Sequence, residues 1–337
     1  MALTGSMPLA KVQVGREVVP GTAVAATRKH PIMSGSLNEH GEINFPQEQR
    51  ESLVANYRGF ATKQFVEVSG MELAPTFEDL PWLLNFAISS NMDGVGTAVS
   101  AQLYDFIPKV ASNDLGTATL EVGDETDEFD INFAVMTRLE LTIAKNAPST
   151  MSVDWVGQKA TVSSFTSNLS DRVTEDINGA LALAYIDTTT IGSTAVTNVI
   201  DAKVSLETKT VQFWALDGNL YPVDVYRNAA RSAAVEMTVA FTDTVEYDVW
   251  QSGLSANGVT PRKIRLYVSG SAIAGTTPAT TKSLTIDLYT VWEEAPFGED
   301  DGLRTVQFKG QTLYNVAAGH DFKWSVVNAV TGGLHAG

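Results

Sequence analysis

Hydrophobic and polar residues alternate along most of the chain, which is typical of strands rather than helices. In the segment 137–145, Leu139, Leu141 and Ile143 fall on one side and polar residues on the other. A period of two predicts a strand with one buried and one solvent-facing side. The same pattern occurs at 65–68, 117–122, 203–213, 234–241, 263–268, 283–289 and 303–308. We expect antiparallel sheet, because parallel sheets bury both faces and lose the alternation.

Turn and loop signals separate these segments. Asp217-Gly218 is the dipeptide of a tight two-residue hairpin. The acidic stretch 123–127 predicts a longer polar turn, and the stretches 187–198 and 270–281, rich in Gly and Thr, predict loops.

One segment, 76–87, has a clear helical pattern. Thr76 or Asp79 can cap it, and Pro81 then lies in the first turn, where its missing N–H costs little. Its apolar stripe consists of Leu80, Leu83, Leu84 and Ala87. The segment 223–235 is a second candidate helix with a weak stripe.

The alternation stops in the polar stretch 163–178, which divides the chain into two strand-rich halves of similar size. We therefore expect a mainly-β protein with an antiparallel sandwich or barrel-like domain at 1–165 and another at 166–337, each with a flanking short helix. A tandem duplication is suggested by this organisation, although the halves do not align residue by residue.

Charge excludes one functional class. The 337 residues include 23 Lys plus Arg and 39 Asp plus Glu, a formal net charge of −16. Because 44% of residues are hydrophobic and only 18% are charged, the chain can build a core. Proteins that hold nucleic acid tightly use basic surfaces, so this composition argues against such a role.

Cysteine is absent, which excludes disulfides, thiol nucleophiles and Cys-ligated zinc. No uncharged apolar run reaches the roughly 18 residues of a membrane helix, and residues 1–11 lack the pattern of a secretory signal. We expect a protein made and assembled inside a cell, without a membrane partner.

No constellation of catalytic residues is evident. The four histidines, His30, His40, His320 and His335, are not spaced as metal ligands and are expected in polar loops. Acidic clusters at 124–130 and 293–301 could hold calcium but lack the regular spacing of a calcium loop. The sequence therefore predicts no enzyme, cofactor or metal site, and favours a structural or binding protein.

Three stretches resemble the tail tube proteins, or major tail proteins, of long-tailed siphovirus-type bacteriophages. They are Val12-Gln13-Val14-Gly15-Arg16-Glu17-Val18-Val19-Pro20-Gly21-Thr22, then Phe77-Glu78-Asp79-Leu80-Pro81-Trp82-Leu83-Leu84, and Trp324-Ser325-Val326-Val327-Asn328. They are similar to that family's extended N-terminal arm, its helix-opening segment and its last strand.

The resemblance implies a protein that assembles with itself into rings stacked as a tube through which DNA is ejected. With two strand-rich halves, the chain is more similar to the members that form trimeric rings than to those that form hexamers. The implied location is the virion tail, assembled in the host cytoplasm. The implied partners are tail terminator, tape measure and distal tail proteins, with double-stranded DNA passing without specific binding.

An acidic lumen would repel DNA phosphates within a Debye length of roughly 8 Å. Candidate lumen-lining residues on polar strand faces are Glu67, Glu140, Glu236 and Asp287. The alternative for each of these four residues is that it faces outward or lies at a subunit interface. The composition also fits an inner-tube protein of a contractile secretion machine, another capsid or decoration protein, or a carbohydrate-binding β-sandwich.

Overall fold

The fold is mainly β and antiparallel, as the alternation predicted. The structure is a computed structural model. It describes residues 10–48, 50–51, 56–88, 95–98, 100–109, 115–124, 126–255, 259–276 and 279–330. The helices are α1 (Leu80–Ala87), α2 (Val245–Ser255) and the short 3₁₀ segment η2 (Gly179–Leu181). The strands are β1 (Lys11–Arg16), β2 (Arg28–His30), β3 (Ser34–Asn44), β4 (Phe60–Leu73), β5 (Val95–Ala98), β6 (Ala101–Phe106), β7 (Ala118–Gly123), β8 (Glu128–Ala144), β9 (Thr150–Gly157), β10 (Lys159–Val162), β11 (Ala182–Asp187), β12 (Ala195–Val196), β13 (Val199–Glu207), β14 (Thr210–Phe213), β15 (Asp224–Arg227), β16 (Ser232–Ala240), β17 (Arg262–Ile273), β18 (Thr280–Glu294), β19 (Phe297–Asp300), β20 (Leu303–Thr312) and β21 (Phe322–Asn328).

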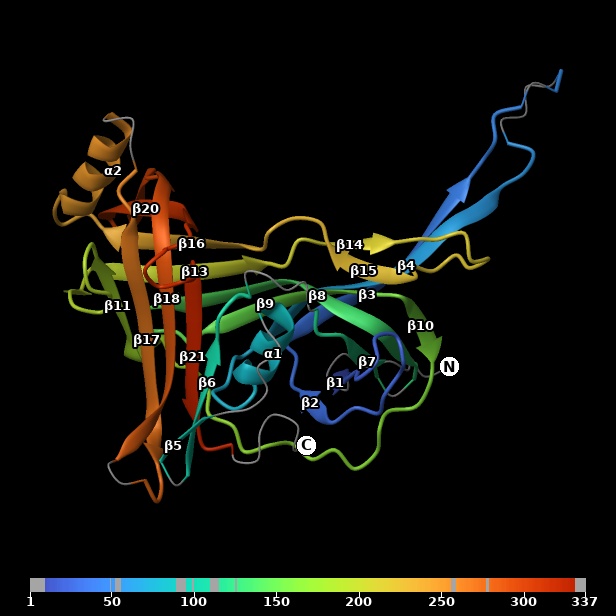
Figure 1. Ribbon diagram of the computed structural model, residues 1–337, viewed down its shortest axis with the longest axis horizontal. Coiled ribbons are helices and arrows are strands. Elements are labelled where there is room, and N and C mark those ends of the chain that lie inside the picture. The colour runs from blue at the N-terminus through green and yellow to red at the C-terminus, as the bar shows by residue number, and fades with distance from the viewer. Residues whose placement is uncertain are drawn as a thin grey trace.

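The strands form layers around a large hydrophobic cluster, and a second, small cluster consists of Phe133, Val135 and Val225. The first layer has the order β3, β4, β9, β8, β13, β16, β20. The second has the order β12, β11, β17, β18, β21, β6, β5, and its strands run steeply across those of the first (Figure 1). The layers are joined where the end of β18 pairs with β20. A smaller group of β2, β1, β7, the first part of β8 and β10 closes one end.

Helix α1 lies inside the molecule rather than on its flank, which corrects the expectation of a flanking helix. All eight of its residues are buried, and Trp82 and Phe86 pack edge to face with ring centroids 4.5 Å apart. A proline lies in the first turn, as predicted; Asp79 occupies the N-cap position, but its side chain makes no capping hydrogen bond. The side chain of Thr76 accepts a hydrogen bond from the Asp79 amide at 3.1 Å, so it orders the entry to the helix.

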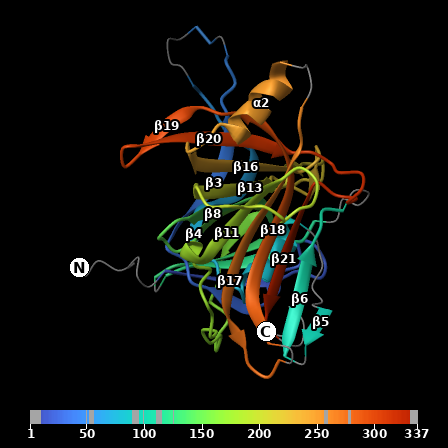
Figure 2. The same ribbon diagram turned by 90° about the vertical axis from the view of Figure 1, so that its left-hand side faces the viewer.

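The prediction of a second helix at 223–235 is wrong. It contains β15 and the beginning of β16, whose alternating burial is that of a strand. The second helix is α2, which lies at the periphery (Figure 2). Its start is fixed by Asp243, which accepts a hydrogen bond from the Val245 amide at 3.1 Å. This is the arrangement of an N-terminal cap.

The predicted strand 203–213 is divided between β13 and β14. The break falls at Lys209, which has a positive φ of 53°. The expected tight hairpin at Asp217-Gly218 is instead part of a ten-residue loop between β14 and β15. A two-residue Asp-Gly turn occurs at Asp301-Gly302, between β19 and β20, where both φ angles are positive (49° and 78°).

The polar stretch 163–178 contains no strand or helix, as expected of a linker. Strands before and after it nevertheless pair directly, since β8 lies beside β13 and β6 beside β21. Buried residues from both halves also belong to the same hydrophobic cluster. The division into tube domains 1–165 and 166–337 stays a prediction.

Candidate functional site

The outward side of the first layer carries a row of alternating charges. Lys203 of β13 lies 2.8 Å from Glu140 of β8, and Arg138 forms a second ion pair with the same carboxylate. Ser205 donates a further hydrogen bond to Glu140 at 3.1 Å. Burial alone would raise the pKa of Glu140, but Lys203 and Arg138 outweigh that effect and lower it. Glu140 is therefore held as an anion between two cations.

The row continues across the next two strands. Glu236 of β16 stands opposite Lys203 on one side and Lys309 of β20 on the other. Lys309 lies 3.8 Å from Glu294 of β18. Because directly opposite residues share one side of an antiparallel sheet, these charges form a continuous surface. We call the side chains Arg138, Glu140, Lys203, Glu236, Lys309 and Glu294 the paired face.

The second layer repeats the arrangement. Asp287 of β18 accepts two hydrogen bonds from Arg265 of β17, at 2.6 and 2.8 Å. The hydrogen bond to Asp287 raises the pKa of Arg265 above its ordinary value. On its other side Asp287 faces Lys323 of β21, which lies 2.9 Å from Asp105 of β6. This second row therefore also alternates in sign.

The remaining candidate acid, Glu67, lies on β4 and is 2.9 Å from the Nε2 atom of His40 on β3. Glu67, Glu140 and Glu236 thus belong to the first layer, and Asp287 to the second. The sequence correctly placed Glu140, Glu236 and Asp287 on polar strand faces. It gave no signal that a basic residue would lie opposite or beside each of them, because that depends on strand register.

A long hairpin of β3 and β4 projects from the body of the molecule (Figure 1). Nearly all of β3 is exposed, and within the described residues β3 pairs with β4 alone. Four large apolar side chains near the end of the hairpin are 45% to 55% exposed: Ile43, Phe45, Tyr57 and Phe60. An open strand edge with exposed apolar side chains is a surface suited to association.

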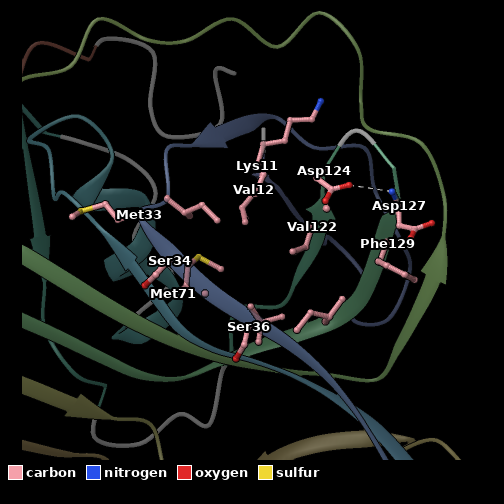
Figure 3. A pocket seen from close by; sticks show the side chains of 16 residues that line it. Lys11, Val12, Met33, Ser34, Ser36, Met71, Val122, Asp124, Asp127 and Phe129 are labelled. Atoms are coloured by element: carbon pink, nitrogen blue, oxygen red, sulfur yellow. Dashed lines mark hydrogen bonds between the residues drawn. The ribbon is translucent and has the colours of Figure 1, made fainter. Parts of the chain in front are cut away.

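A cavity of about 270 Å³ lies between β1, β3, β4 and the β7–β8 turn (Figure 3). Its wall is largely apolar, with Val12, Met71 and Phe129 among its residues. Asp124 and Asp127 lie at one side of the cavity and hydrogen-bond to each other across the turn.

Two of the histidines, His30 and His40, lie in strands rather than in the polar loops that the sequence predicted, whereas His320 lies in a loop as predicted. His30 lies in β2 and is buried against Trp82, with ring centroids 5.4 Å apart. His40 lies in β3, His320 lies in a loop beside Tyr289, and His335 lies outside the described residues. In the part of the chain that the structure describes, no group of three His, Asp or Glu side chains could hold a metal ion.

A buried ionic cluster joins three distant parts of the chain. Lys282 of β18 lies 2.6 Å from Glu78, beside α1, and 3.0 Å from Glu175 of the linker. Glu78 also accepts a hydrogen bond from the Glu175 amide at 2.9 Å. Burial would lower the pKa of Lys282, but its bonds to the two carboxylates outweigh burial and raise it. The cluster fixes the linker against both halves.

No protein-family model matches the chain, and no curated protein matches it significantly. Neither α1 nor α2, the α-helices of the described part of the chain, is long and apolar enough to cross a bilayer.

Proposed function

We propose that this protein is a structural subunit that polymerises into stacked rings forming a tail tube of a long-tailed bacteriophage. The observation that carries the proposal is the β3–β4 hairpin. Its 11-residue outer strand is almost wholly exposed, and four large apolar side chains near its end are 45% to 55% exposed. A monomer gains little from such an element, whereas a polymer can bury it between copies.

The order of the three resembling stretches supports the same function. In this proposal, rings form from trimers in preference to hexamers, and the lumen-lining acids come from the set Glu67, Glu140, Glu236 and Asp287. The tube guides DNA during ejection and meets terminator, tape measure and distal tail proteins at its ends. The protein is neither an enzyme nor a cofactor carrier.

Negative-stain microscopy of the purified chain tests the proposal. We expect long hollow tubes of stacked rings, and native mass spectrometry of dissociated rings then gives their stoichiometry. A monodisperse monomer at high concentration would count decisively against the proposal.

A hairpin variant sharpens this test. Ile43→Ser with Phe60→Ser removes two exposed apolar side chains without touching the core, so the fold should persist while tubes are lost. Val173→Ser is the matched control, because Val173 is also exposed but lies in the linker. Equal tube formation by the hairpin variant and the control would show that the hairpin is not a contact between copies.

A further inference from the structure

We propose that the paired face is the surface that this protein presents to double-stranded DNA, and that its internal ion pairs prevent adhesion by keeping its cations from the phosphates. This inference rests on the proposed tube function. In this explanation DNA does not adhere because the cations of a mixed-charge wall are neutralised locally, rather than because an acidic wall repels the phosphates.

The first step is that each cation of the paired face already has a carboxylate as its ion-pair partner. Arg138 and Lys203 share Glu140, and Arg138 also stands opposite Asp154 of β9 and Glu207 of β13. Lys309 pairs with Glu294 and faces Glu236. A phosphate can bind one of these cations only by competing with a carboxylate that the sheet holds in place.

The second step concerns what DNA binding requires. Affinity for duplex DNA comes largely from Lys and Arg that neutralise phosphates and release counterions. A cation already neutralised by a neighbouring carboxylate contributes little to that release. The face therefore has the polarity to stay hydrated next to DNA but lacks the free positive charge that would hold it.

The third step is why the first layer is favoured over the second. The outward side of the second layer includes Tyr185 and Tyr289 as well as Tyr267, all partly exposed. Aromatic rings offer stacking and apolar contact, which favour adhesion. On the first layer the residues between the charges are small and polar, such as Thr142 and Ser205. That surface is the better wall for rapid passage.

The experiment removes the carboxylates and leaves the cations. The double variant Glu140→Gln, Glu294→Gln removes the carboxylates that are ion-paired with Arg138, Lys203 and Lys309. We expect unassembled protein to bind a 30-base-pair duplex about tenfold more tightly than wild type at low salt. The dependence of log K on log salt should steepen by about 2, since each new phosphate contact adds roughly 0.9.

The matched control is Glu39→Gln, Glu299→Gln, which changes the net charge equally. Both residues are exposed, and neither forms one of the ion pairs found among the described residues. If control and test variants gain the same affinity, net charge alone is responsible and the pairing proposal is wrong. Should the double variant fold poorly, the single Glu140→Gln variant must still bind the duplex more tightly than Glu299→Gln.

A second measurement tests which way the face points. The chain has no cysteine, so Thr142→Cys introduces one thiol on the paired face. In assembled tubes we expect a small maleimide to label it and a long-polymer maleimide to fail, whereas both label unassembled protein. Equal polymer labelling in tubes places the face outside and overturns the inference without affecting the tube function. Failure of wild type to form any tubes overturns the function itself.

Discussion

The side-chain amide of Asn328 donates a hydrogen bond to the backbone carbonyl of Phe77 at 2.8 Å. The residues are 251 positions apart, and Asn328 is fully buried at the end of β21. The carbonyl oxygen of the same amide accepts a hydrogen bond from the Val330 N–H at 3.0 Å. The last described strand is thus anchored directly to the segment that leads into α1.

We expect Asn328→Leu to lower the free energy of unfolding by about 2 kcal/mol. It leaves the Phe77 carbonyl without this donor in a buried site, and unsatisfied buried groups cost about 1–3 kcal/mol. Urea denaturation measures the change. Asn44→Leu, at an exposed position of β3, is the control and should be nearly neutral; a loss no larger than the control's would show that the bond contributes nothing.

Lys282→Met should destabilise the protein by about 2–3 kcal/mol. It removes the cation from between Glu78 and Glu175 and leaves a largely buried carboxylate uncompensated. The comparison is Lys29→Met, whose partner Asp171 is exposed and whose loss should cost under about 0.5 kcal/mol. Similar costs for both variants, measured by denaturant titration, would contradict a structural role for the cluster.

Stability should fall as the pH drops from about 6.5 to 4, in part because of His30. The pKa of His30 is lowered to about 4, mainly by burial; Asp79 opposes this shift, and Arg28 and Arg172 add to it. Within this window the unfolded chain binds a proton that the folded chain excludes, so acid favours unfolding. The shift corresponds to about 3 kcal/mol.

His30→Gln should remove this part of the pH dependence of the free energy of unfolding. Asn38→Gln, at an exposed position of β3, provides the control and should leave the pH dependence unchanged. Parallel curves for wild type and His30→Gln between pH 4 and 7 would disprove the assignment.

Gly310→Ala should disrupt the junction of the two layers. A Cβ at Gly310 would lie 2.3 Å from the Val291 carbonyl oxygen, where β18 meets β20, so the backbone must shift. We expect a loss of about 2 kcal/mol, within the range for overpacking. At Gly41 a Cβ meets nothing within 4 Å, so Gly41→Ala should be tolerated. Thermal unfolding of the two variants measures the difference. Equal melting temperatures would refute the prediction that Gly310→Ala is the less stable variant.

Local sequence patterns predicted the elements that depend on neighbouring residues. They failed for elements that are stabilised by contacts with distant parts of the chain. The spacing of Leu80, Leu83 and Leu84 predicted α1, because helical periodicity is local. Helix α2 was missed because its aromatic Tyr247 packs with Phe241, Phe297 and Trp250 instead of belonging to a regular apolar stripe. At 223–235 the strand β16 is stabilised by β13 and β20, which override weak local preference.

The sequence by itself determined the fold class and the side of the sheet on which Glu140, Glu236 and Asp287 lie. A period of two fixes which residues face solvent but not which residues lie across from them. Only the tertiary structure decided that Glu140 meets Lys203, because β8 and β13 are remote in sequence. It also decided that Asp287 meets Arg265, because the register of the β17–β18 hairpin depends on its bulge and loop. It also decided that His30 is buried, since its cover comes from α1. The negative charge of the whole chain could be read from its composition, whereas its local neutralisation required the fold.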